Sequence, residues 1–143
     1  MFSPSRDEAR RYFFETWKKY RGGGPLSALE QTALSVITLH PEYHALLDDA
    51  ERNLDRDFTP ADGAINPFLH LSLHLAVEEQ LSIDQPPGMR AAYERLLAIT
   101  GSEHDTKHAV LECLGETLWQ AQRAGTAPDA VVYLQCIEGK SRA

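Results

Sequence analysis

The six histidines of this 143-residue chain form three pairs, and within each pair the two residues are four positions apart. On an α-helix, residues four apart lie on one face with their Cβ atoms about 5–6 Å from each other, so two imidazoles can chelate one metal ion. Random placement of six histidines would give about 0.2 such pairs. The sequence therefore predicts metal ligands. The pairs are His40 and His44, His70 and His74, and His104 and His108.

A glutamate follows two of these pairs, one further helical turn along the chain. Glu78 comes four residues after His74, and Glu112 comes four residues after His108. Imidazole with carboxylate, and without a cysteine motif, suits iron, manganese, zinc or nickel, and suits magnesium or calcium poorly. We expect one or two divalent transition metal ions as the cofactor. The predicted ligands are His40, His44, His70, His74, Glu78, His108 and Glu112.

The direction in which each pair faces decides whether its imidazoles can share an ion. On a helical wheel, His108 and Glu112 fall on the same side as Leu111, so we expect both to face the core. A glutamate inside a core must be paired, hydrogen-bonded or bound to a metal. His104 stands in the first turn of the same helix, where we expect it to be exposed and a weaker candidate.

The second pair belongs to a nearly apolar helix whose main polar stripe consists of His70, His74 and Glu78. Val77 and Leu81 flank this stripe, and both prefer burial. We therefore expect the stripe to face inward. Hydrogen-bonded interior histidines and surface histidines are the alternatives.

The first pair spans a junction between helices. Pro41 cannot stand in a helix interior, so His40 is expected to cap a new short helix that contains His44. Metal ligation and an ordinary capping role remain equally open for both residues.

The elements that must position these residues are all helices. Glycine and proline divide the chain into segments with helical periodicity, and no segment has the alternation of a strand. We expect an all-α fold, a compact bundle of about six helices forming a single domain over residues 1–143, with a long loop at about residues 48–65. The expected helices are roughly 5–20, 27–40, a short one to 47, 66–82, 89–99, 102–125, and one from 128 onward.

Composition and charge narrow the class of protein further. With 43% hydrophobic residues the chain can bury one core of its own, and a net charge of −7 argues against nucleic acid. Residues 1–11 are charged and lack the apolar stretch of a signal peptide, so we expect none, and no apolar run of about 18 residues occurs, so no membrane is expected. Cys113 and Cys136 match no disulfide framework, which predicts reduced cysteines and a cytoplasmic location. A metal ion is the expected partner, with a small molecule as a further candidate; the oligomeric state stays open.

The ligand spacing resembles that of hemerythrin-like bundles, which also combine a His-x-x-x-His helix with a His-x-x-x-Glu helix. The Glu-x-x-His spacing of ferritin-like di-iron proteins does not occur at these histidines, and no His-Glu-x-x-His protease motif is present. The similarity to hemerythrin-like bundles concerns ligand spacing only.

Three strings of the sequence resemble a known family. The strings are HPEYHALL at 40–47, NPFLHLSLHLAVEEQLSIDQP at 66–86 and ECLGETLWQAQRAGTAPD at 112–129. Because they occur in this order over essentially the whole chain, the protein resembles the bacterial domain-of-unknown-function family 1841. This resemblance implies no activity, since the family is named for lacking one.

Three functions from different classes fit these observations. The first is a non-haem metal-binding helical protein with a redox or sensing role. The second is a metal-dependent hydrolase or transferase, in which the ion activates water and Glu78 or Glu112 accepts its proton. The third is an acidic helical interaction protein in which the histidines are structural.

Overall fold

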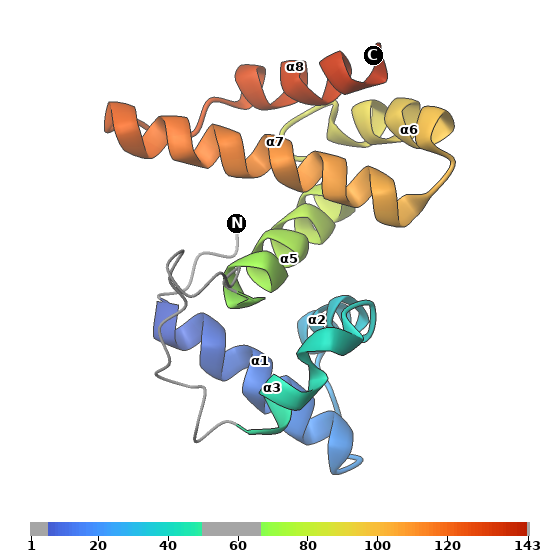
Figure 1. Ribbon diagram of the computed structural model, residues 1–143, viewed down its shortest axis with the longest axis vertical. Coiled ribbons are helices and arrows are strands. Elements are labelled where there is room, and N and C mark those ends of the chain that lie inside the picture. The colour runs from blue at the N-terminus through green and yellow to red at the C-terminus, as the bar shows by residue number, and fades with distance from the viewer. Residues whose placement is uncertain (1–5, 50–66, 143) are drawn as a thin grey trace. The chain divides into compact units, whose positions relative to one another are not determined.

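The computed structural model describes residues 6–49 and 67–142. Within these residues the secondary structure is α-helical apart from one short 3-10 helix, and no strand is present, so the predicted all-α fold is confirmed. Most of the loop expected at about residues 48–65 lies outside the described residues. The elements are α1 (Arg6–Arg21), α2 (Ala28–Thr38), η1 (Pro41–Tyr43), α3 (His44–Asp48), α5 (Pro67–Ile83), α6 (Met89–Thr100), α7 (Glu103–Ala124) and α8 (Ala130–Ser141) (Figure 1).

The chain divides into two compact units, one of residues Phe2–Leu75 and one of Ala76–Ala143 together with Met1. The boundary falls inside α5, so the first part of this helix belongs to the first unit and the remainder to the second. That residues 1–143 form a single domain stays a prediction from the sequence.

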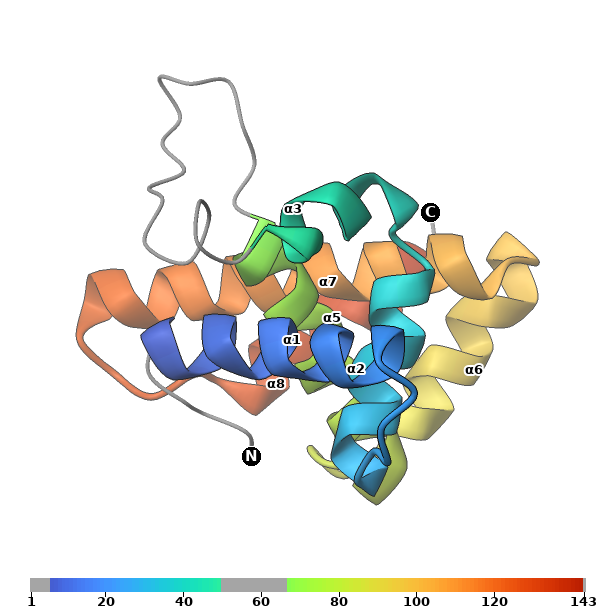
Figure 2. The same ribbon diagram turned by 90° about the horizontal axis from the view of Figure 1, so that it is seen from below.

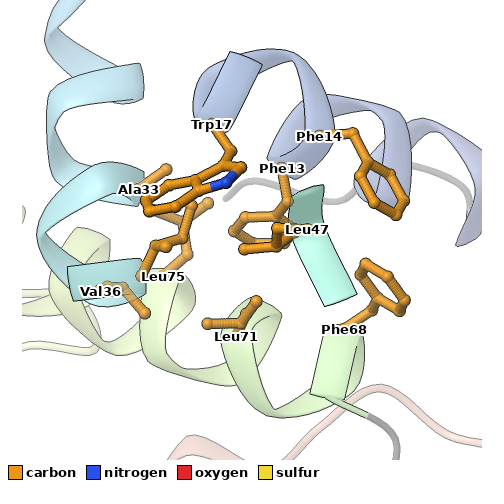
Figure 3. Packing of buried hydrophobic residues seen from close by; sticks show 10 residues of the cluster. Phe13, Phe14, Trp17, Ala33, Val36, Leu47, Phe68, Leu71 and Leu75 are labelled. Carbon is orange, nitrogen blue, oxygen red and sulfur yellow. The ribbon is translucent and has the colours of Figure 1, made fainter. Parts of the chain in front are cut away.

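The first unit is built on the apolar faces of α1, α2 and α5. Within it, α1 packs against both α2 and α3 (Figure 2). The buried side chains recur at three- and four-residue spacing, as expected for helices that each bury one face. Figure 3 shows this cluster, which consists of Phe13, Phe14, Trp17, Ala33, Val36, Ile37, Leu47, Phe68, Leu71 and Leu75.

Local capping explains where the helices begin and end. Ser27 caps α2, and its hydroxyl accepts from the Glu30 amide while the Glu30 carboxylate accepts from the Ser27 amide. Hydrogen bonds from Lys19 and Ser27 lower the pKa of Glu30. Ser102 caps α7 by accepting from the Asp105 amide, and Gly125 ends it in the left-handed conformation that favours glycine.

The second unit contains α6, α7 and α8, each packed against the other two. Its buried side chains include Met89 and Leu96 of α6, Val110 and Leu114 of α7, and Ile137 of α8. Among the described residues, no helix combines the length and the apolar character that crossing a membrane needs.

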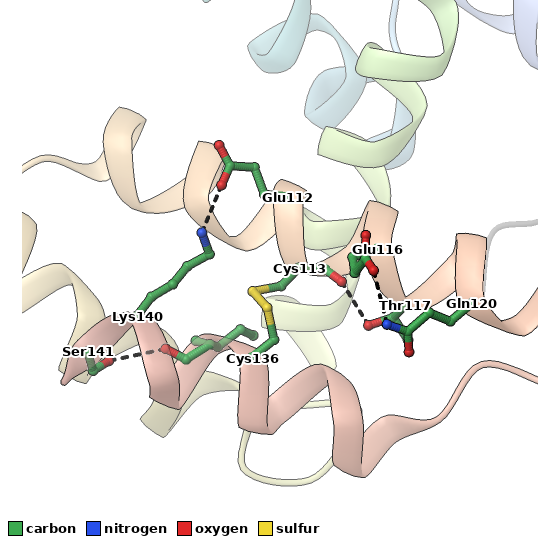
Figure 4. The surroundings of a disulfide bond; sticks show 9 residues. Glu112, Cys113, Glu116, Thr117, Gln120, Cys136, Lys140 and Ser141 are labelled. Carbon is green, nitrogen blue, oxygen red and sulfur yellow. Dashed lines mark hydrogen bonds and ion pairs between the residues drawn. A yellow bond between two sulfur atoms is a disulfide. The ribbon is translucent and has the colours of Figure 1, made fainter. Parts of the chain in front are cut away.

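A disulfide joins α7 to α8 in this unit. The bond connects Cys113, which is buried, to Cys136, with their Cα atoms 5.7 Å apart (Figure 4). The prediction of reduced cysteines is therefore wrong, because the antiparallel return of the chain brings together two residues that are 23 positions apart. Disulfides persist mainly in oxidising compartments, so this bond removes one argument for a cytoplasmic location. That location stays a prediction.

Removing the disulfide should destabilise the protein. Closing a loop of this size restricts the unfolded chain and stabilises the fold by about 3 kcal/mol. We expect Cys113→Ala/Cys136→Ala to lower the Tm measured by circular dichroism without reductant. In excess dithiol, the wild type should have the same Tm as the double variant. If the wild-type Tm exceeds the variant Tm by the same amount with and without dithiol, the disulfide is not the cause of the difference and this account is contradicted.

Candidate metal centre

Three histidines of the first unit bring their Nε2 atoms together. His40 stands before η1, while His70 and His74 lie on successive turns of α5. The Nε2 atom of His70 is 3.1 Å from Nε2 of His40 and 3.2 Å from Nε2 of His74. His40 and His74 are each only 2% exposed, so this polar cluster lies at the edge of the hydrophobic core.

The nitrogen–nitrogen distances match those of ligands on one metal ion. Zinc–nitrogen bonds are about 2.0–2.1 Å long, so two nitrogens on one ion lie about 2.9–3.4 Å apart for octahedral to tetrahedral angles. Both measured separations fall in this range. The residues present therefore fit a metal ion.

The tautomer of His40 is set by the backbone of α2. Its Nδ1 lies 2.8 Å from the carbonyl oxygen of Val36. A carbonyl oxygen can only accept, so Nδ1 bears the proton and Nε2 of the neutral ring presents a lone pair to His70. Metal-ligating histidines are oriented in this way by a hydrogen bond from the other ring nitrogen.

The Nε2 atom of His70 faces two other Nε2 atoms, and a single N–H on it can donate to only one of them. A metal ion would accept the lone pairs of all three rings at once. Tyr43 adds a further restraint, because its ring stacks on His40 with centroids 5.5 Å apart and planes 5° from parallel.

His44 does not join this group. Its Nε2 lies 3.0 Å from the carbonyl oxygen of Ile37, to which it donates, and its ring packs against Trp17 with centroids 4.5 Å apart and planes tilted by 33°. The histidines after α2 thus add side-chain donors to two carbonyl groups in its last turn, which also accept from the backbone amides of Leu39 and His40. Of the two roles left open for this residue, the structure supports the capping role.

Trp17, on α1, contacts both His44 and Asp48, the first and last residues of α3. Its indole Nε1 donates to Asp48 Oδ1 at 2.7 Å, and Arg21 lies 3.3 Å from the other carboxylate oxygen of Asp48. The hydrogen bond from Trp17 is the main reason why the pKa of Asp48 is lowered.

The two predicted carboxylate ligands are each paired with a lysine. Glu78 lies 2.6 Å from the amino group of Lys107, in a partly buried ion pair. Glu112 lies 2.8 Å from Lys140, with 74% of its side chain exposed (Figure 4). The prediction that Glu112 faces the core is wrong.

The packing of α6 and α8 explains this error. The buried face of α7, which packs against both helices, includes Val110, Cys113, Leu114 and Thr117, which recur at three- and four-residue spacing, and Cys113 is joined to α8 by the disulfide. Glu112 lies beside this face and reaches solvent. A wheel shows which residues share a side, but it does not show which side the neighbouring helices will cover.

The third histidine pair lies on α7, in the second unit. The rings of His104 and His108 are 4.3 Å apart between centroids. His104 is exposed, as expected, and His108 is half-buried. Ligation by His108 stays a prediction from the sequence.

Comparison with known proteins gives one match. The family model described as "Domain of unknown function (DUF1841)" matches residues 5–139. The chain belongs to this family. No curated protein and no solved structure matches it. All three histidines of the cluster lie within the family match.

Sequence reasoning missed two groups that orient the centre in this family member. These are the carbonyl of Val36 and the ring of Tyr43, both of which contact His40. A signal for the first was present, because His40 follows Val36 by four residues at the end of a helix. The stacking of Tyr43 had no comparable signal.

The two hydrogen bonds to α2 predict opposite tautomers for neighbouring histidines. Two-bond proton–nitrogen correlation spectra of the metal-free protein should show His40 protonated at Nδ1 and His44 protonated at Nε2, because each donates to a carbonyl through that atom. His40→Gln and His44→Gln variants assign the signals. Finding His40 protonated at Nε2 alone would refute the proposed orientation of its lone pair.

Proposed function

We propose that this protein binds one divalent transition metal ion through the Nε2 atoms of His40, His70 and His74. The convergence of three imidazole nitrogens at ligand spacing, in a largely buried position, is the observation that supports it. The hydrogen bond from His40 to Val36 supports it further, since it places the proton on Nδ1 and directs the lone pair of Nε2 toward His70 and the proposed ion.

The donor set narrows the choice of metal. Three imidazoles without a carboxylate suit zinc, nickel or iron(II), whereas manganese is better served by carboxylate oxygen. Both predicted carboxylates are held in ion pairs with lysines. We therefore propose zinc, nickel or iron(II) ahead of manganese.

Among the functions expected from the sequence, metal sensing fits this arrangement best. His40 and His70 are 30 residues apart and lie on different elements, so an ion that binds both will stabilise their packing. A structural ion and a sensed ion both act in this way, and they differ in how readily the metal exchanges.

Metal-assisted hydrolysis is the second candidate. Three histidines leave one tetrahedral position, which in catalytic zinc sites holds the attacking water. Against this role, the glutamates expected as general bases are paired with Lys107 and Lys140. A redox role would require a redox-active ion such as iron, which zinc is not.

Metal content of untagged protein is the first test. Inductively coupled plasma mass spectrometry should find about one ion per chain in the wild type. His40→Gln and His70→Gln should each lose it, because removal of one ligand of three lowers affinity by at least about 100-fold, beyond the 10–100-fold that outer-shell changes cost. His104→Gln is the matched control, since this histidine is exposed on α7.

Two further results test the proposed metal site and its ligands. Wild-type protein that folds but neither contains nor takes up zinc, nickel or iron, and gains no Tm from them, would refute the proposal. Glu78→Gln and Glu112→Gln should retain their metal, whereas the sequence prediction of carboxylate ligands expects loss. A His108→Gln variant tests that residue in the same assay.

A further inference from the structure

The segment that follows His40 is too short to be stable by itself. It consists of η1, of three residues, and α3, of five, and neither has a side-chain hydrogen bond to its N-terminal backbone. Isolated helices shorter than about 12–15 residues are marginal in water. The order of residues 41–48 must therefore come from anchors to the rest of the first unit.

These anchors are spaced along the segment at regular intervals. His40 precedes it and belongs to the proposed metal centre, and His44 in its middle contacts Ile37 and Trp17. At its end, Leu47 is buried and Asp48 accepts the indole hydrogen of Trp17. Two of the anchors thus meet at one indole ring.

We propose that α3 is the element that responds to the metal, so that binding at His40, His70 and His74 orders residues 41–48 and fixes the indole of Trp17. This inference rests on the proposed metal site and specifies how that site would be regulated. The ion holds His40 against α5, and His44, one turn away, then keeps its packing contact with Trp17. Without the ion, His40 keeps its hydrogen bond to Val36 but loses the metal link to α5, which leaves a segment of weak local stability less firmly held.

The indole itself reports this change. The chain has two tryptophans, and Trp119 is 51% exposed on α7. The Trp119→Phe variant therefore leaves Trp17 as the single tryptophan, whose fluorescence can be excited selectively. Zinc is the appropriate probe, because Zn²⁺ has a filled d shell and no redox chemistry of its own.

We expect zinc titration of Trp119→Phe to change the emission of Trp17, with saturation at the metal stoichiometry found by elemental analysis. Adding His44→Gln should leave metal content unchanged and abolish most of the emission change, because the link between the centre and the indole is lost. Asp48→Asn provides an independent second variant, which should also retain metal and weaken the response. The matched control is His104→Gln, which should preserve both metal and response.

The outcomes separate this inference from the proposed function. Zinc bound at full stoichiometry without any change in Trp17 emission would overturn the response of α3 and leave the metal site standing. An emission change that persists in both His44→Gln and Asp48→Asn would also overturn the proposed response of α3. Absence of zinc binding to the wild type would instead refute the metal site itself. Amide hydrogen exchange of residues 41–48 should slow on zinc addition and gives a readout independent of fluorescence.

Discussion

The hydrogen bond from Nδ1 of His40 to the carbonyl oxygen of Val36 is the constraint on which the candidate centre depends. It occupies one ring nitrogen with a carbonyl at the end of α2, and so directs the lone pair of the other toward His70. The same carbonyl also accepts from the backbone amide of Leu39, so it receives both donors at the end of α2. One side-chain hydrogen bond therefore selects a tautomer and positions a candidate ligand.

The proposed metal ion in the first unit and the disulfide in the second would stabilise the protein in the same way, by joining residues that are far apart in the sequence. In the first unit, a metal ion would join His40 to an α5 histidine 30 residues away. In the second, the disulfide joins Cys113 to Cys136 across 23 residues. The disulfide restricts the unfolded chain by closing a loop, and the proposed metal ion would do the same. The short α3 segment has no such covalent support.

Local periodicity made the helices, the capping box at Ser27 and the pairing of His70 with His74 predictable, because each depends on residues within one or two turns. The approach of His40 to that pair, and of Cys113 to Cys136, depends on how separate helices pack, which a wheel does not contain. Glu112 illustrates the limit. Its exposure follows from the positions of α6 and α8, and its pairing with Lys140 comes from another helix.

X-ray absorption spectroscopy at the metal edge of the purified protein tests the central claim most directly, because it counts the atoms bound to the ion. The account predicts a first shell dominated by imidazole nitrogen at about 2.0–2.1 Å for zinc, with the outer-shell scattering of three histidine rings. A first shell dominated by carboxylate oxygen, or one containing sulfur at about 2.3 Å, would contradict it.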